Sequence, residues 1–433
     1  MNNNDEIIED LTKGKLKSPI NNKILDIPIK NIKLLPSTDG LEVNFIKKYH
    51  FDEKILIISD DTTWDVLGSR VFKNLSKKIN IKNFIWKNPA SSIEGVNYLR
   101  DISKDYSVLI AIGSGTINDS VKYATYLDKK KYSVFPTSPM NAYTSPTASI
   151  SFKGIKKSIY THFPIGVYFD LSILSKAPKR LIKSAFSDVL CRTTSQFDWI
   201  LSNRILNSKY NETPYYLLNL YENELIKSAK DVINNDMDSI SLLTKVSAIM
   251  GLSTFFTGST HYGSMSEHGI SHFIDNFSKN NHPGTSHGEQ VGIATLTISK
   301  IQNSLLKFKD PPEIFPTKIP ENSIKKIFGN ETLKLVKKEM KNKNFSLKKT
   351  KEINKYLNSN WNKIVKDLKK ITIKYEDLWK TMGEYKAIRT IEEANLNKEF
   401  YNNAIKYSRF MRDRYTILDF IDDSKILENY IIL

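Results

Sequence analysis

The N-terminal part of the chain alternates short apolar runs with amphipathic stretches, and this alternation constrains the fold more than any other feature. The clearest run is SVLIAI at residues 107–112, which a glycine turn follows directly. Further β-rich runs lie at residues 54–59, 84–86, 132–135 and 167–169, and the stretches at 64–79 and 93–103 have helical spacing. Strands that alternate with helices predict a parallel sheet covered on both faces.

The pattern changes to helical spacing after about residue 174. Apolar residues recur every three or four positions through residues 181–200, 215–233 and 240–256. A proline-containing loop is expected at 311–320, and helical segments resume from 323 to 415. A chain of 433 residues is long enough for two domains. We therefore predict an α/β domain over residues 1–174 and an all-α domain over residues 175–433.

The charge and the cysteine content exclude some classes of protein. The net charge is +17, but the lysines are scattered, with the densest stretch at residues 337–370. The chain has no arginine-rich tract with interleaved aromatic residues, which a nucleic-acid groove would favour. We interpret these lysines as a solvated surface. The sequence contains no run of roughly 18 apolar residues, so we expect no membrane span. The N-terminus lacks the pattern of a secretory signal, and the single cysteine, Cys191, fits the reducing cytoplasm.

The glycine turn after the best strand has the chemistry of a phosphate-binding loop. It reads Gly113, Ser114, Gly115, Thr116, Ile117. Glycines there let backbone N–H groups approach an anion, and the helix that follows presents its positive end. An ordinary strand-to-helix turn also uses glycine, and the spacing is not Gly-x-Gly-x-x-Gly. Asp60, after an earlier strand, has two possible roles: an acceptor for a ribose hydroxyl, or the N-cap of a helix.

A second loop follows the run at 132–135 and is rich in small hydroxyl residues. It covers residues 136–145 and contains Thr137, Ser138, Asn141 and Ser145. Open α/β sheets bind ligands at the carboxyl ends of their strands, where this loop is expected. An ordinary polar loop is the alternative.

The histidines form the most informative constellation. Five of the seven lie between His261 and His287, and two of these, His268 and His272, are four residues apart. On a helix this spacing places both imidazoles on one face, and imidazole is a common ligand of divalent metals. Asp188 lies in an apolar helical stretch, where a carboxylate is costly unless it is paired or bound to a metal. A structural histidine pair is the alternative.

Taken together, these motifs resemble the sn-glycerol-1-phosphate dehydrogenase family, within the superfamily of iron-containing alcohol dehydrogenases and dehydroquinate synthase. The resemblance covers roughly residues 20–425. Five blocks carry it: residues 113–122 (GSGTINDSVK), 136–145, 185–190 with Asp198 and Trp199, 266–272 with His287 and Gly288, and 407–419 (YSRFMRDRYTILD).

The resemblance implies a role for each motif. It implies an N-terminal dinucleotide-binding domain, a helical C-terminal domain and a homodimer. The pyrophosphate of NAD or NADP would lie on Gly113, Ser114, Gly115, Thr116 and Ile117, the ribose on Asp60, and the nicotinamide half near Thr137, Ser138 and Ser145. A divalent metal, most often zinc, with nickel or iron as alternatives, would bind Asp188, His268 and His287. His272 would face the substrate and act in catalysis together with Asp188.

One departure from the family pattern concerns the substrate. The usual loop contains Ser-Met-Asp-Gly-Tyr, whereas this chain reads Pro-Met-Asn-Ala-Tyr at residues 139–143, so that Asn141 replaces a substrate-contacting aspartate. The sequence thus predicts a metal-dependent NAD(P)-linked dehydrogenase acting on glycerol 1-phosphate, dihydroxyacetone phosphate or another polyol (phosphate). A metal- and NAD-dependent cyclase of the dehydroquinate synthase type and a non-catalytic binding protein are the alternatives.

Overall fold

The computed structural model describes residues 7–152, 155–278, 281–330 and 332–431. These residues form two compact units. The first comprises the described part of Met1–Ala185 with Glu212–Ser259, and the second comprises Phe186–Asn211 with Thr260–Leu433.

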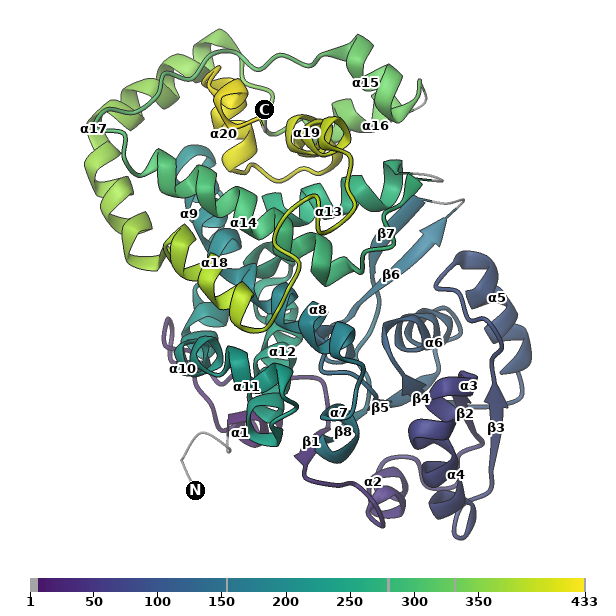
Figure 1. The fold of residues 1–433 in the computed structure, drawn as a ribbon. Helices are drawn as coiled ribbons and strands as arrows, with labels where there is room; N and C mark the ends of the chain where they lie inside the picture. Colours follow the sequence, from purple (N-terminus) through teal and green to yellow (C-terminus); the bar gives the residue numbers. More distant parts are fainter. Residues whose placement is uncertain (1–6, 153–154, 279–280, 331, 432–433) are drawn as a thin grey trace. The chain divides into compact units, whose positions relative to one another are not determined.

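A parallel six-stranded sheet is the centre of the first unit (Figure 1). Its order is β1-β8-β5-β4-β2-β3, and its strands are β1 (Asn31–Leu35), β2 (Ile55–Ser59), β3 (Ile81–Ile85), β4 (Val108–Gly113), β5 (Lys131–Pro136) and β8 (Gly166–Asp170). The five predicted strands are confirmed. Strand β1 was not predicted, because it is a short edge strand in which only Ile32 is fully buried.

Both faces of the sheet are buried, as its apolar strands require. On one face, Ile57 and Ile110 pack in a core that includes Val71 of helix α4. The alternate residues Leu56 and Leu109 are buried as well. The helices near the sheet are α2 (Glu42–Lys47), α3 (Asp61–Thr63), η2 (Trp64–Gly68), α4 (Ser69–Ser76), α5 (Ile93–Ile102), α6 (Gly115–Leu127) and α7 (Leu171–Leu174).

The strand order changes direction between β2 and β4. The chain runs outward from β2 to β3, returns to β4 beside β2, and then continues on the other side through β5 and β8. Ligands of open parallel sheets bind outside the carboxyl ends of the strands at such a switch point. The chain's own topology therefore places the ends of β2, β4 and β5, where the predicted nucleotide residues lie, at this position.

The first unit also contains elements that were not predicted there. Strands β6 (Thr147–Phe152) and β7 (Ile155–Tyr160) form an antiparallel hairpin. Helices α10 (Thr213–Lys227), α11 (Ala229–Ile233) and α12 (Met237–Thr257) belong to this unit, as does α1 (Ile7–Thr12). This division differs from the boundary predicted at residues 174 and 175, because helical spacing shows that a segment is a helix but not which core it packs against.

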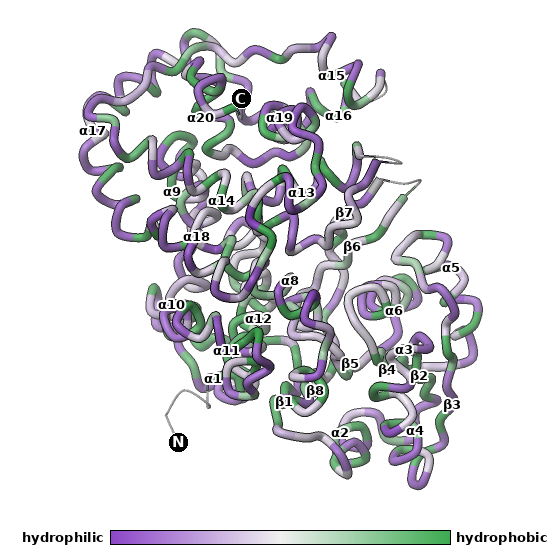
Figure 2. The backbone as a smooth tube through the Cα atoms, viewed as in Figure 1, coloured by the Kyte–Doolittle hydropathy of each residue, from purple (hydrophilic) through white to green (hydrophobic). Residues whose placement is uncertain are grey.

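Helix α12 is coloured largely as hydrophobic in Figure 2. It has the length and hydropathy of a membrane span, but 67% of its apolar window is buried within the protein. Helix α10 packs along it. These contacts identify α12 as a core helix.

The described residues of the second unit form helices joined by loops, with no strand among them. Its core joins residues such as Phe197, Phe273 and Trp361. In the longest helix, α17, residues Ile353, Leu357, Trp361 and Ile364 are buried, while its lysines carry the predicted solvated charge. The helices are the end of α8 (Lys179–Leu190), α9 (Arg192–Leu206), η4 (His261–Gly263), α13 (Ser266–Phe277), α14 (His287–Leu305), α15 (Glu321–Phe328), α16 (Thr332–Glu339), α17 (Leu347–Ile371), α18 (Tyr375–Glu384), α19 (Lys398–Tyr407), η6 (Ser408–Met411), α20 (Ile417–Asp423) and η7 (Leu427–Tyr430).

Candidate functional site

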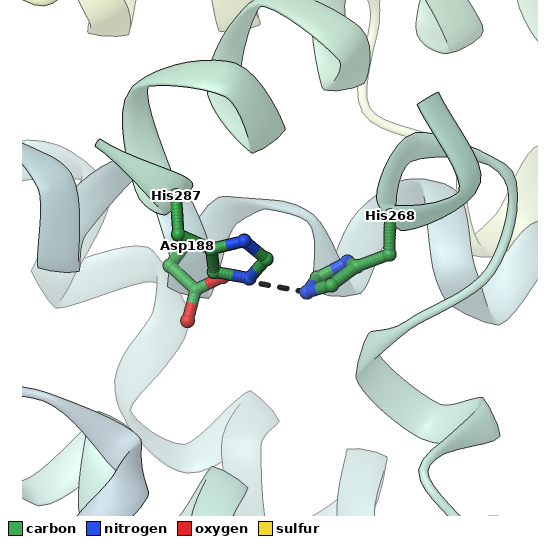
Figure 3. Close-up of side chains that lie close together, drawn as sticks. All are labelled: Asp188, His268 and His287. Carbon is green, nitrogen blue, oxygen red and sulfur yellow. Dashed lines mark ion pairs between the residues drawn. The ribbon is translucent and has the colours of Figure 1, made fainter. Parts of the chain in front are cut away.

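Three side chains from three helices converge in the second unit (Figure 3). Asp188 comes from α8, His268 from the first turn of α13, and His287 is the first residue of α14. Oδ1 of Asp188 lies 3.5 Å from Nε2 of His268 and 3.8 Å from Nε2 of His287. One ligand atom from each residue lies within 4.8 Å of the others. The structure therefore brings together the three residues predicted to bind a metal.

A neighbouring carboxylate orients His268. Oε1 of Glu267 lies 3.0 Å from Nδ1 of His268 and also accepts from the backbone N–H of Met265 at 2.7 Å and the hydroxyl of Ser195 at 2.8 Å. Burial alone would raise the pKa of Glu267, but these hydrogen bonds, led by that from His268, hold the pKa below its usual value. An ionised carboxylate only accepts, so Nδ1 of His268 carries a proton, which leaves Nε2 as the nitrogen that can bind a metal.

Two polar side chains orient His287 in the same way. The hydroxyl of Ser271 donates to Oε1 of Gln290 at 2.8 Å, and the same oxygen lies 3.1 Å from Nδ1 of His287. Since the only proton of that hydroxyl is used, Ser271 accepts from Nδ1–H of His287. Nε2 of His287 is then the basic nitrogen, and it faces Asp188.

The cluster fits a divalent metal. Two imidazole lone pairs and a carboxylate oxygen converge, and such acceptors repel one another unless a proton or a cation lies between them. Burial would lower the pKa of His268, but the hydrogen bonds to Asp188 and Glu267 raise it above the ordinary value. This raised pKa shows that the position favours positive charge. Three protein ligands of this type are typical of catalytic zinc, which keeps a further position open.

His272 lies beside the cluster. Its ring centre is 6.2 Å from that of His268 and 5.9 Å from that of His287, whereas the rings of His268 and His287 are 5.1 Å apart. The two histidines nearest to Asp188 therefore come from successive helices rather than from the i, i+4 pair on α13.

In the first unit, the glycine turn leads directly from β4 into α6. Helix α6 begins at Gly115, and its first backbone N–H groups have no partner within the helix. A side chain on Gly115 would meet open space, whereas one on Gly113 would clash with Ile117, whose own side chain is fully buried. Ser114 is the N-cap residue but makes no capping hydrogen bond with its side chain. The turn thus offers backbone donors and open space, as a bound phosphate requires.

Asp60 follows β2 and caps the short helix α3. Its Oδ1 accepts from the backbone N–H of Thr63 at 2.7 Å and from the hydroxyl of Thr63 at 2.9 Å. The same hydroxyl also reaches the carbonyl oxygen of Ile112 at 3.1 Å, which links this position to the end of β4. The N-cap role of Asp60 is thus present, and only its second oxygen remains for the predicted contact with a ribose.

The loop at residues 136–145 is fastened to the glycine turn. The backbone N–H of Thr137 donates to the carbonyl oxygen of Gly113 at 3.2 Å, and the hydroxyl of Tyr143 donates to the same oxygen. Ser138 is fully buried and bonds to Tyr143 at 2.6 Å. Ser145 is buried and its hydroxyl lies 2.7 Å from that of Thr147. These hydroxyls hold the loop's own shape, whatever contacts it makes with a ligand.

Asn141 starts the short helix η3 (Asn141–Tyr143) in this loop. Helix α12 supports it from within the first unit: the hydroxyl of Ser247 donates to the carbonyl oxygen of Pro139 at 2.9 Å, and the hydroxyl of Thr144 donates to that of Ala248 at 2.8 Å. Gly251 allows this close approach, since a Cβ there would lie 2.4 Å from the carbonyl oxygen of Asn141.

The sequence analysis did not identify the residues that orient the two histidines. Glu267, Ser271 and Gln290 received no role, although each lies within one helical turn of a predicted ligand. Glu267 precedes His268, Ser271 is three residues after it, and Gln290 is three residues after His287. Such spacing was a usable signal, because a metal-bound histidine generally donates its second N–H to an oxygen.

The first unit has a parallel sheet with a phosphate-type turn, and the second has an Asp-His-His cluster; the former suits a dinucleotide and the latter a divalent metal. The model of the iron-containing alcohol dehydrogenase family matches residues 36–178. The chain is 27% identical over 271 residues to the glycerol-1-phosphate dehydrogenase [NAD(P)+] of Halalkalibacterium halodurans. The aligned region covers 60% of this chain and 68% of the relative. It is 27% identical over 282 residues to the glycerol-1-phosphate dehydrogenase [NAD(P)+] of Pyrococcus furiosus. This aligned region covers 62% of this chain and 80% of the relative.

The fold is also found among solved structures. The crystal structure of glycerol dehydrogenase from Schizosaccharomyces pombe superposes with a TM-score of 0.61 at 16% identity and covers 91% of this chain and 87% of its own. Residues 36–178 are thus similar to the iron-containing alcohol dehydrogenase family, and both relatives are glycerol-1-phosphate dehydrogenases.

Proposed function

We propose that this protein is a metal-dependent, NAD(P)-linked dehydrogenase that oxidises a secondary alcohol of a polyol phosphate such as glycerol 1-phosphate, or reduces the corresponding ketone. The observation that carries the proposal is the convergence of Asp188, His268 and His287, in which Nδ1 of each imidazole lies within hydrogen-bond distance of an oxygen and Nε2 is directed to the cluster. The names of the relatives, which are glycerol-1-phosphate dehydrogenases, support the substrate class.

A divalent ion at this cluster would polarise the substrate oxygen, and the nicotinamide would supply the hydride chemistry. The chain's own residues do the remaining work. Glu267 and Ser271 hold the two imidazoles in the required tautomers. His272, beside the cluster, relays the hydroxyl proton, since an imidazole exchanges protons near neutral pH. Zinc is the first choice of metal, with nickel or iron as alternatives.

Asp60 bears on the choice of cofactor. Its carboxylate stands at the end of β2, beside the glycine turn at the end of β4. A carboxylate accepts from a ribose 2′-hydroxyl and repels a 2′-phosphate. We therefore propose NAD rather than NADP. Gly113, Ser114, Gly115, Thr116 and Ile117 would contact the pyrophosphate through their backbone, and Thr137, Ser138 and Ser145 would line the nicotinamide end. The enzyme is proposed to act as a soluble homodimer in the cytoplasm.

The test is a substrate screen on protein of known metal content. The purified chain is loaded separately with zinc, nickel and ferrous iron, and NADH and NADPH formation are followed with glycerol, glycerol 1-phosphate, glycerol 3-phosphate and longer polyol phosphates. Formation of NADH with a polyol phosphate is the expected result. Consumption of a substrate without net NADH would instead identify a cyclase. A protein that binds no metal and shows no rise in melting temperature with any of the three ions would overturn the catalytic proposal.

Asn141 is the position proposed to set the substrate. The amide of Asn141 can bind a hydroxyl, but it lacks the negative charge of the aspartate that is usual in the sn-glycerol-1-phosphate dehydrogenase family. Asn141→Asp should raise kcat/KM for glycerol 1-phosphate relative to other polyol phosphates, and Asn44→Asp, on the surface helix α2, serves as a control for the added charge. Equal kcat/KM ratios in both variants would show that this loop does not select the substrate.

A further inference from the structure

Asp198 is a fully buried carboxylate in helix α9 of the second unit, and it accepts hydrogen bonds from three other helices. Its Oδ2 accepts from the backbone N–H of Ser266 at 3.2 Å and from the hydroxyl of the same residue. Its Oδ1 accepts from Nε2 of Gln302 at 2.9 Å and from the backbone N–H of Ile417 at 3.2 Å. One side chain of α9 is thus bonded to α13, α14 and α20.

Two of these donors are the first residues of their helices. Ser266 begins α13 and Ile417 begins α20, and the first N–H groups of a helix have no partner within it. In α13 the N-cap residue, Met265, makes no capping hydrogen bond with its side chain, so the carboxylate from α9 takes the place of a local cap. Negative charge is also favourable at this end of a helix. The start of α13 is therefore fixed by a residue 68 positions earlier in the chain.

The helices that meet at Asp198 are those that bear the ligands of the metal-type cluster. His268 lies two residues after Ser266 on α13. Gln302 lies on α14, whose first residue is His287. The third ligand-bearing helix, α8, ends one residue before the N-cap-linked start of α9 at residue 192. A displacement of the Asp198 carboxylate would therefore change the position of one histidine relative to the other.

Helix α9 also holds the carboxylate that orients His268. The hydroxyls of Thr194 and Ser195, about one turn before Asp198, donate to Glu267 at 3.2 Å and 2.8 Å. Glu267 in turn lies 3.0 Å from Nδ1 of His268. One face of α9 thus determines the first turn of α13 both at its backbone and at its carboxylate.

We propose that Asp198 is a positioning residue that sets the spacing of the two metal-binding histidines. It acts through helices α13 and α14 and not through a contact with the metal. A bound metal requires each ligand within about 0.2 Å of its preferred distance, so a small shift of α13 relative to α14 is enough to weaken binding. The inference rests on the proposed function, because it takes the cluster to bind a divalent metal.

Asp198→Asn tests this role with little change in side-chain size. An amide has one oxygen and one NH2 group, so in either orientation its nitrogen faces the backbone N–H of Ser266 or of Ile417, which then lacks an acceptor. We expect zinc affinity, measured by competition with a chromophoric chelator, to fall about tenfold, as when other groups that support a metal ligand are removed. The d–d absorption spectrum of the cobalt-loaded protein, which reports the ligand geometry, should change as well.

Asp423→Asn is the matched control. Asp423 is buried in the same unit and bonds to Arg409 and Thr317, neither of which is part of α13 or α14. This variant should lower the melting temperature but keep the zinc affinity and the cobalt spectrum of the wild type. Gln302→Met is a second variant in case Asp198→Asn does not fold. It removes the side-chain bonds from α14 to α9 and should also weaken zinc binding.

The outcomes separate this role from the proposed function. Zinc affinity and a cobalt spectrum equal to those of the wild type in Asp198→Asn and Gln302→Met would overturn the positioning role, even if the wild type oxidises polyol phosphates. An equal loss of zinc affinity in Asp423→Asn would also overturn it, because the loss would then follow general destabilisation. Weaker zinc binding in the first two variants alone would support it, even if no dehydrogenase activity is found.

Discussion

The carboxylate of Glu267 and the imidazole of His268 are joined by a 3.0 Å hydrogen bond between adjacent residues. Glu267 is completely buried and bonds to Met265, Thr194 and Ser195 besides. The carboxylate is therefore fixed before any ligand binds, and it fixes the orientation of the imidazole in turn. The metal-type cluster is preorganised by two contacts. Glu267 and His268 pair within helix α13, and Ser271 of α13 contacts His287 of α14.

Replacing Glu267 by glutamine should weaken metal binding. The variant keeps nearly the same shape but loses the charge that favours a metal-bound imidazole, and loss of such a partner typically costs about 10- to 100-fold in metal affinity. Zinc affinity is measured by competition with a chromophoric chelator. Glu352→Gln, an exposed position on α17, controls for the change in net charge. Equal zinc affinities of Glu267→Gln and wild type would contradict the proposed orienting role.

The histidines should separate into two groups on substitution. His268→Ala and His287→Ala each remove one of the three converging ligand atoms, so that bound metal and activity are both lost. His272→Ala removes an imidazole beside the cluster, so that the metal remains while most turnover disappears. Metal content by plasma mass spectrometry and initial rates of NADH formation give the two readouts. Loss of metal in His272→Ala would show that the i, i+4 pair chelates the ion.

Much of the fold was predictable because each strand of the parallel sheet carries its own signal. β2, β4, β5 and β8 are buried on both faces, so their sequences are nearly continuous apolar runs. The edge strand β1 and the hairpin β6–β7 are buried on fewer positions and were missed. The assignment of α10–α12 to the sheet's unit was also missed, because it depends on contacts between segments far apart in the sequence.

For the candidate site, the sequence indicated the residues but not how they are brought together. His268 and His287 stood out by clustering, but only the fold brings Asp188 to them, across 80 and 99 residues of sequence. The local capping role of Asp60 and the internal hydrogen bonds of Ser138 and Ser145 show a further limit. A residue type that suits a ligand suits the loop's own backbone equally well, and sequence alone does not separate the two uses.

Gly251 should be indispensable for the loop at residues 136–145. In Gly251→Ala the new Cβ would lie 2.2 Å from Oγ1 of Thr144 and 2.4 Å from the carbonyl oxygen of Asn141, so the loop must shift away from α12. Overpacking of this kind costs about 1–3 kcal/mol. Both the melting temperature and the NADH affinity, measured by fluorescence titration, should fall. Gly269→Ala, another helix-interior glycine with its nearest contact at 3.6 Å, should retain both.

Acid sensitivity should arise in part from His50. This side chain is buried in the first unit with Nε2 2.8 Å from the hydroxyl of Ser133, and burial, with the charge of Lys131, lowers its pKa to about 4. Because the unfolded chain binds a proton at a higher pH, near 6.5, the contribution to stability is present above 6.5 and is lost as the pH falls toward 4.

The variant His50→Gln isolates this contribution. It retains a polar partner for Ser133 but does not titrate, so the stability difference between wild type and variant should shrink by about 2 kcal/mol between pH 8 and pH 5. Urea unfolding at the two pH values gives that difference. His162, which is half-buried and also has a pKa of about 4, titrates in both proteins and cancels. A difference independent of pH would mean that the pKa of His50 is the same in the folded and unfolded proteins, with the effect of burial offset by Glu53.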